Sequence, residues 1–339
     1  MYLNHIHNFR SFAICGIVGA HALYNFEWQN NELMFVFFDS LFNESSIWFF
    51  FIAGFLFQYL SPRYSYGDYL LKKLKFVIVP YLILSVPALV ASEFWVKQEV
   101  PATFYALPVW EQVSLFLLTG KHLAPFWFVP TITIFYLIAP VFIKMDKLKW
   151  PYLLLPAVIL LSAFLGRDGF LTATGLSGYY SPFSKGIYLF SVYFFGLFCS
   201  RYHQKVLDLM KKYHLIILTF VVVFFFSEMY WHGQQVYCQY LFKIFSCPLL
   251  IYYLYVYDGL LKERFGYLGT VSFGLFFIHG YLLSALKFIY FEATGLNNLP
   301  DGNLLNYTVL VLFVLLVCTY LLYFSRQYFG KSSRMLVGC

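Results

Sequence analysis

Long apolar runs, separated by short charged or turn-rich segments, are the feature that most constrains this chain. Of its 339 residues, 61% are hydrophobic and only 12% are charged, whereas a soluble domain carries about 25% charged residues. So few charges do not cover the surface of a water-soluble globule of this size. A transmembrane helix needs about 20 mainly apolar residues. The composition therefore predicts an all-α integral membrane protein and argues against a soluble enzyme.

The positions of the apolar runs predict about ten membrane-spanning helices. They leave only short loops, so we expect one polytopic membrane domain over residues 1–339 and no extracytoplasmic soluble domain. A further apolar stretch, 109–119, is too short to cross a bilayer and is expected to be interfacial or re-entrant. The predicted spans are 9–27, 45–60, 74–96, 125–143, 151–166, 186–200, 214–231, 236–257, 271–291 and 304–325.

The distribution of Lys and Arg predicts the orientation, because cytoplasmic loops of membrane proteins carry an excess of these residues. With the N-terminus inside, the expected cytoplasmic segments hold 17 of the 23 Lys and Arg residues, and the expected outer loops hold four. The first outer loop, 27–44, carries four acidic residues and no basic residue. This asymmetry predicts that both termini face the cytoplasm.

Several kinds of chemistry find no support in the sequence. The net charge of +7 comes without a dense Lys/Arg tract, which argues against a nucleic-acid partner. The six cysteines form no CxxC motif and no Cys/His spacing typical of metal ligands, so no metal site is expected. A serine hydrolase is not supported either, since neither a GxSxG elbow nor a Ser-His-Asp order is found.

The first predicted span contains a basic residue and a histidine on one face. Arg10 and His21 are eleven positions apart, which places them within about 20° of the same helical face and about 16 Å apart along the axis. Asn25 follows one turn later on that face. Taken singly, His21 also fits a polar group hydrogen-bonded within the bundle, and Arg10 an ordinary cytoplasmic anchor.

Together the two residues suit a ligand with an anionic head and a long thin arm, such as acyl-coenzyme A. A cation at the cytosolic mouth would meet the phosphates, and an imidazole about 16 Å deeper would take a proton from an attacking hydroxyl. Polar groups inside a bilayer are costly to bury, so they are functional candidates by default.

Five segments occur in an order that matches a known family. The segment 8–13, followed by His21, contains an Arg and a His separated by ten residues, and further segments follow it at 47–56, 72–81, 126–130 and 272–280. Together they resemble the motifs of the membrane-bound acyltransferase-3 family. The sequence departs from the family's motifs in two places. Lysines replace the usual arginines of the basic motif, and Ala53 replaces the usual serine before Gly54.

The resemblance implies an enzyme of a bacterial cytoplasmic membrane. It would move an acyl group, acetyl or succinyl, from cytosolic acetyl-CoA or succinyl-CoA to a sugar hydroxyl of a surface polysaccharide or lipid-linked glycan. His21 matches the catalytic histidine of the family and Arg10 the arginine associated with it. Whether the acyl group passes through an acyl-histidine or is transferred directly stays open.

Further residues complete the predicted site, each with a plainer alternative. Lys72, Lys73 and Lys75 would join Arg10 in binding the donor phosphates, although such a cluster is also typical of a cytoplasmic loop. Trp127, Asn25, Glu228 and Tyr179 are candidates for contacts with the acceptor. Trp127 also fits an aromatic belt, and Glu228 also fits helix packing or the orientation of His21. His279 is expected to be structural.

Two other functions remain open on the sequence alone. The chain could be a transporter or flippase of glycans or lipids, although it shows no inverted repeat and no cluster of intramembrane acids. It could also be a polysaccharide polymerase, although the outer segments 97–124 and 167–185 carry few basic residues.

Overall fold

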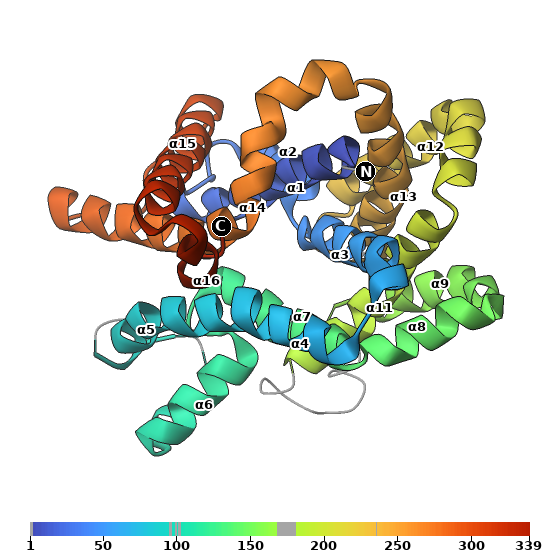
Figure 1. Ribbon diagram of the computed structural model, residues 1–339. Coiled ribbons are helices and arrows are strands. Elements are labelled where there is room, and N and C mark those ends of the chain that lie inside the picture. Colours follow the sequence, from blue (N-terminus) through green and yellow to red (C-terminus); the bar gives the residue numbers. More distant parts are fainter. Residues whose placement is uncertain (1–2, 95–96, 99, 101–102, 168–180, 235) are drawn as a thin grey trace.

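The computed structural model describes residues 3–94, 97–98, 100, 103–167, 181–234 and 236–339, and every regular element in these ranges is a helix (Figure 1). Within them, extended pairing is limited to an isolated bridge between Glu27 and Asp301. The prediction of an all-α fold is therefore confirmed.

The first half of the described chain forms short and medium helices, some of them broken by single turns of another helix type. They are α1 (Asn4–Ala22), η1 (Leu23–Asn25), α2 (Glu32–Phe42), α3 (Ser46–Leu60), η2 (Ser61–Arg63), α4 (Tyr66–Lys73), the π-helical η3 (Leu74–Ile78), α5 (Val79–Phe94), η4 (Phe104–Ala106), α6 (Val109–Thr119), η5 (Ala124–Trp127), α7 (Phe128–Leu137), α8 (Ala139–Leu148), η6 (Trp150–Leu154) and α9 (Leu155–Leu165).

The second half forms longer helices. They are α11 (Ser181–Arg201), α12 (His203–Tyr230), α13 (Val236–Val256), α14 (Asp258–Thr294) and α15 (Leu304–Phe329), followed by the short η8 (Gly330–Ser332) and α16 (Ser333–Leu336).

The described part of each predicted span falls mainly on one of these helices or on helices joined end to end, but the count of ten is not confirmed. By length and composition, six helical segments of the described chain suit a membrane crossing, and a bent pair would make a seventh. The difference has a physical reason, because α1 begins with several polar residues and α9 has only eleven residues. The sides on which the termini lie stay a prediction.

The bent pair joins α7 to α8 at an angle of 54°. Pro140 stands in the first turn of α8, and a proline has no backbone N–H to continue the hydrogen bonds of the preceding helix. The segment 109–119, which the sequence marks as too short to span, forms the separate eleven-residue helix α6.

Helix α1 lies inside the bundle rather than at its edge. It contacts α2, α3, α13, α14 and α15, and Figure 1 shows α14 arching beside it. Its side chains Phe9, Ala13, Ile14 and Val18 are fully buried. The polar residues His5, Asn8 and Ser11 of this helix are buried as well, which is the condition for placing such groups at membrane depth.

Helices α3 and α11 approach each other most closely through two glycines. A Cβ atom on Gly196 would overlap the backbone oxygen of Phe51, and one on Gly54 would overlap the backbone oxygen of Tyr193. Small residues at such crossings let helix backbones come together, which is a common basis of helix association in membranes.

We expect Gly196→Ala to separate α3 from α11 and to lower the free energy of unfolding by about 1–3 kcal/mol, the usual cost of overpacking. Gly186→Ala on the same helix is the matched control, because its Cβ would meet no atom closer than 3.6 Å. Unfolding temperatures in detergent measure both changes. Equal unfolding temperatures for the two variants would contradict the role given to Gly196.

The predicted orientation can be tested with two cysteines introduced into a background without native cysteines. Gly67 stands on the predicted cytoplasmic side, and Asn298, which is exposed, stands on the predicted outer side. A membrane-impermeant maleimide should label Asn298→Cys in intact cells and Gly67→Cys only after the cells are opened. The reverse pattern would overturn the orientation.

Candidate active site

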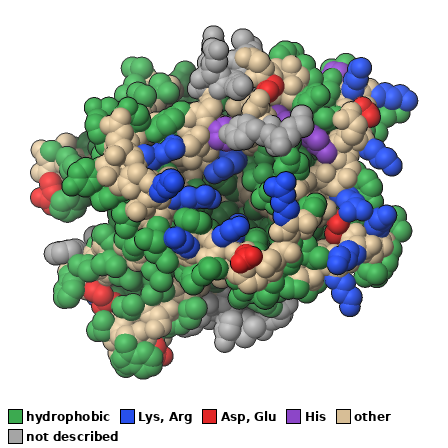
Figure 2. All heavy atoms as spheres, viewed as in Figure 1, with side chains coloured by type: hydrophobic (Ala, Val, Ile, Leu, Met, Phe, Trp, Pro, Cys, Tyr) green, Lys and Arg blue, Asp and Glu red, His purple; other side chains and the backbone are tan. Residues whose placement is uncertain are grey.

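A cluster of cations surrounds Arg10 near the start of α1. The charge of Lys73, at the end of α4, interacts with the charges of Arg10 and of Arg334 in α16. Lys73 thus lies within electrostatic reach of a like charge from each of two other elements. Figure 2 shows Lys and Arg side chains gathered around a hollow on this face of the molecule. Such an arrangement favours an anion with several charges.

Aromatic rings hold the lysines of the basic segment. The Nζ atom of Lys73 lies 4.6 Å from the ring centre of Tyr136 and 5.2 Å from that of Tyr69. The Nζ atom of Lys75 lies 5.6 Å from the ring centre of Phe76. The π-helical turn η3 begins directly after Lys73, and such turns are frequent at functional sites. Lys72 lies exposed on α4.

Arg334 is the member of this cluster that the sequence did not single out. Its guanidinium carbon lies 4.4 Å from the ring centre of Phe76, and its helix α16 packs on α5 and η3. Gly338 follows with a φ of +82°, where a Cβ would press on the ring of Phe277. Apart from its charge, nothing in the sequence could have linked Arg334 to this cluster, because Arg334 lies near the C-terminus, far along the chain from Lys73.

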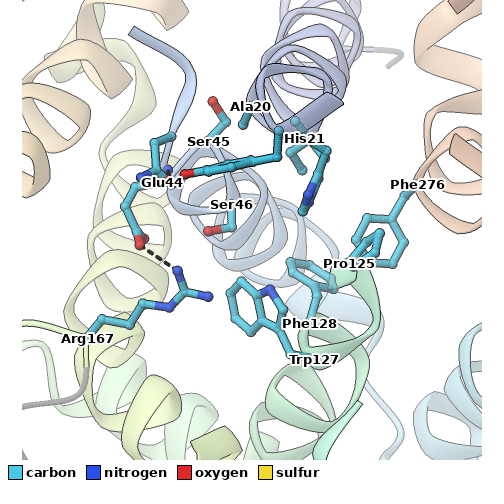
Figure 3. Close-up of a pocket in the computed structure, with 13 residues that line it drawn as sticks. Ala20, His21, Glu44, Ser45, Ser46, Pro125, Trp127, Phe128, Arg167 and Phe276 are labelled. Atoms are coloured by element: carbon cyan, nitrogen blue, oxygen red, sulfur yellow. Dashed lines mark hydrogen bonds and ion pairs between the residues drawn. The ribbon is translucent and has the colours of Figure 1, made fainter. Parts of the chain in front are cut away.

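His21, near the end of α1, lines a cavity with a volume of about 90 Å³. This space suits a few water molecules or a small acyl group. Trp127 and Arg167 lie across the cavity from His21 (Figure 3). The lining residues are Ile17, Ala20, His21, Tyr24, Asn43, Glu44, Ser45, Ser46, Pro125, Trp127, Phe128, Arg167 and Phe276.

The ring of His279 lies beside that of His21, with 5.3 Å between the ring centres. His279 is fully buried, and its Nδ1 lies 2.9 Å from the carbonyl oxygen of Leu275. Since a carbonyl only accepts, Nδ1 carries the proton, which leaves Nε2 as an acceptor. His279 therefore places a second buried imidazole beside His21, and its Nε2 has no hydrogen-bond partner among the described residues.

An ion pair closes another wall of the cavity. Nη1 of Arg167 lies 2.9 Å from Oε1 of Glu44. The indole of Trp127 lies against two cations, with its ring centre 4.6 Å from the guanidinium carbon of Arg167 and 4.4 Å from Nζ of Lys185. The sequence marked Trp127 but treated Glu44 and Arg167 only as loop charges. Nothing in their local pattern distinguishes them from other loop residues.

A buried lysine supports the turn that carries Glu44. Nζ of Lys243 donates to the backbone oxygen of Leu41 at 2.6 Å and to Oγ of Ser45 at 3.4 Å. It also lies 4.0 Å from the ring centre of Trp48. Glu44 itself has a positive φ of 56°, which is uncommon outside glycine. The lysine thus fixes a turn whose backbone is strained next to the cavity.

The remaining acceptor candidates lie elsewhere or outside the described ranges. Nδ2 of Asn25 donates to the backbone oxygen of Leu283 at 3.0 Å, which ties η1 to α14. Glu228 is buried near the end of α12, where its charge interacts with those of His232 and Asp39. Neither residue lines the cavity of His21. Tyr179 lies outside the residues that the structure describes.

Neither part of the site is built like a metal centre. Within the described ranges, no three His, Cys, Asp or Glu side chains converge as metal ligands would. The side chains that do lie together are the cations near Arg10 and, around His21, a pair of histidines and an ion pair. These groups suit an anionic ligand and proton transfer, respectively.

Comparison with known proteins identifies the class. A family model described as an acyltransferase domain matches residues 3–323, which is nearly the whole chain, so the protein belongs to the acyltransferase-3 family. Together with its apolar helices, this membership makes the chain a multi-pass membrane acyltransferase. No curated protein and no solved structure matches it significantly.

Proposed function

We propose that the protein transfers an acyl group, acetyl or succinyl, from cytosolic acetyl-CoA or succinyl-CoA to a sugar hydroxyl of a surface polysaccharide or lipid-linked glycan in a bacterial cytoplasmic membrane. One observation carries the proposal: the single helix α1 joins a cluster of cations at Arg10 to a cavity at His21. Arg10 and His21 are about 16 Å apart along the helix axis. A ligand with an anionic head and a long thin arm, such as acyl-coenzyme A, would need an anion site and a base at such a separation.

The phosphates of the donor would lie at the cluster formed by Arg10, Lys73 and Arg334. Arginine binds phosphate through two parallel hydrogen bonds, whereas lysine acts as a point charge. The pantetheine arm would follow α1 and bring the thioester to the cavity. Trp127 offers an aromatic face against which a sugar ring can pack.

His21 would act as the general base in a direct transfer. The acceptor oxygen attacks the thioester carbon while the His21 imidazole takes the hydroxyl proton. The carbon–sulfur bond then breaks, and the proton passes from the imidazolium to the sulfur, so that coenzyme A leaves as the free thiol. The acceptor gains an ester, and neither an oxidant nor a metal is needed for the balance.

We expect His21→Ala to lower the rate of acylation by about 10²–10⁴-fold, the usual contribution of a general base. The matched control is His214→Ala, because His214 is a partly buried histidine that stacks on Tyr252 away from the cavity. Mass spectrometry of the surface glycan measures the acyl groups added per repeat unit. A His21→Ala protein that inserts normally and acylates at the wild-type rate would refute the general base.

We expect Arg10→Ala and Arg334→Ala each to weaken binding of coenzyme A by about ten- to a hundredfold, since a hydrogen bond to a charged group contributes about 1.5–3 kcal/mol. Arg10→Lys should recover only part of the loss. The control is Lys331→Ala, an exposed charge in the same C-terminal segment as Arg334.

Calorimetry with purified protein in detergent measures these affinities. Pantetheine, which lacks the nucleotide phosphates, should bind the wild type and the arginine variants equally. If Arg10→Ala and Arg334→Ala bind coenzyme A as tightly as the wild type, the phosphates do not lie at this cluster.

A further inference from the structure

The cavity of His21 contains a permanent positive charge that the general-base step does not use. Among the described residues that line it, Arg167 is the one with a permanently cationic side chain. Figure 3 shows its guanidinium directed toward the space between Trp127 and His21. The charge of Arg167 also interacts with His21. A fixed cation therefore shares one small space with the candidate base.

Both the guanidinium and the backbone of Arg167 are held by neighbouring residues. Its Nη1 donates to Glu44 at 2.9 Å, and the Trp127 ring lies 4.6 Å from its central carbon. Oγ of Ser184 in α11 donates to the backbone oxygen of Arg167 at 3.1 Å. The side chain is 30% exposed, so it is neither sealed in the core nor free in solvent. A guanidinium carries five N–H donors in a fixed plane, and Nη1 is the atom that donates to Glu44.

Glu44 orients this guanidinium without filling the cavity. Its carboxylate is only 10% exposed, and the buried Lys243 supports the turn on which it stands. A buried carboxylate next to an arginine fixes the direction of the whole guanidinium plane, because the planar fork moves as one unit. Such preorganised donors stabilise a developing charge at little cost in reorganisation.

We propose that Arg167 donates hydrogen bonds to the thioester carbonyl oxygen as acyl transfer turns it into an oxyanion. This proposal rests on the function proposed above. When the acceptor oxygen adds to the carbonyl carbon, the π electrons move onto the carbonyl oxygen, and the hydroxyl proton moves to His21. When the intermediate collapses, the electrons return to form the ester carbonyl, and the carbon–sulfur bond breaks.

A different role for Arg167 would give a different kinetic pattern. If the guanidinium bound an anionic group of the acceptor, its loss would raise KM for the acceptor and leave kcat at saturation intact. An oxyanion donor acts mainly in the transition state, so its loss lowers kcat and leaves both KM values nearly unchanged. Separating kcat from KM therefore distinguishes these two roles.

The experiment uses the full-length protein in nanodiscs. The donor is [¹⁴C]acetyl-CoA or [¹⁴C]succinyl-CoA, whichever the wild type uses, and the acceptor is glycan from cells that lack the gene. Arg167→Ala should lower kcat by about 10²–10³-fold, as for the loss of one oxyanion donor, with both KM values within about twofold of wild type. Added guanidinium ion should restore part of the lost rate, because it can occupy the space left by the side chain.

Lys185→Ala is the matched control. Lys185, like Arg167, lies against the indole of Trp127, but it does not line the cavity. The kcat of Lys185→Ala should therefore stay within about threefold of wild type. Arg167→Lys and Glu44→Gln replace each side chain with one of similar size, so they provide the same test if Arg167→Ala folds poorly. Both should lower kcat without raising either KM, because Lys lacks the planar fork and Gln lacks the charge that orients it.

Two results would overturn the proposal. In one, kcat of the Arg167 variants stays at the wild-type value. In the other, KM for the acceptor rises while kcat is kept, which assigns Arg167 to acceptor binding. Failure of the proposed function looks different, because the wild-type protein itself would then transfer no label from either acyl-CoA to the glycan.

Discussion

The cost of placing polar groups at membrane depth is the constraint on which the rest of this structure depends. Helix α1 carries Asn, His, Arg and Ser residues, and such groups are stable in a bilayer only when protein surrounds them. Helices α3, α13, α14 and α15 pack around α1. Side chains of α1 also bond directly to α14: Asn4 donates to Asp258, and Ser11 donates to the backbone oxygen of Phe265.

Enclosing α1 gives its two ends different chemical surroundings. Toward its start, the charge of Arg10 interacts with that of Lys73, which also interacts with Arg334. Toward its end, His21 lies beside His279 and shares a cavity with Trp127 and Arg167. The Glu44–Arg167 pair and the buried Lys243 show how the surroundings of His21 are held, since each of these charges has an oppositely charged or polar partner. A rigid helix thus keeps the cation Arg10 and the cavity of His21 at a constant separation.

The sequence anticipated the parts of the candidate site that lie in one helix or one motif. Arg10 and His21 share a face of α1 because helical periodicity is a local property, and Trp127 stands in a short motif. The sequence could not anticipate Arg334, Glu44 or Arg167, because their importance depends on residues far away in the chain. Asn25 shows the limit of this reasoning, because it stands in the separate turn η1 and its side chain bonds to α14 rather than lining the cavity.

Composition and periodicity alone determined that this chain is a helical membrane protein, because the balance of apolar and charged residues decides whether a chain can be soluble. They also placed the helices, although not the number that cross the membrane. The tertiary structure alone decided which side chains meet: Arg334 with Phe76 beside the basic segment, and Arg167 with Glu44 and Trp127. The physical reason is that helix formation depends on near neighbours in the chain, whereas a site depends on how distant helices pack.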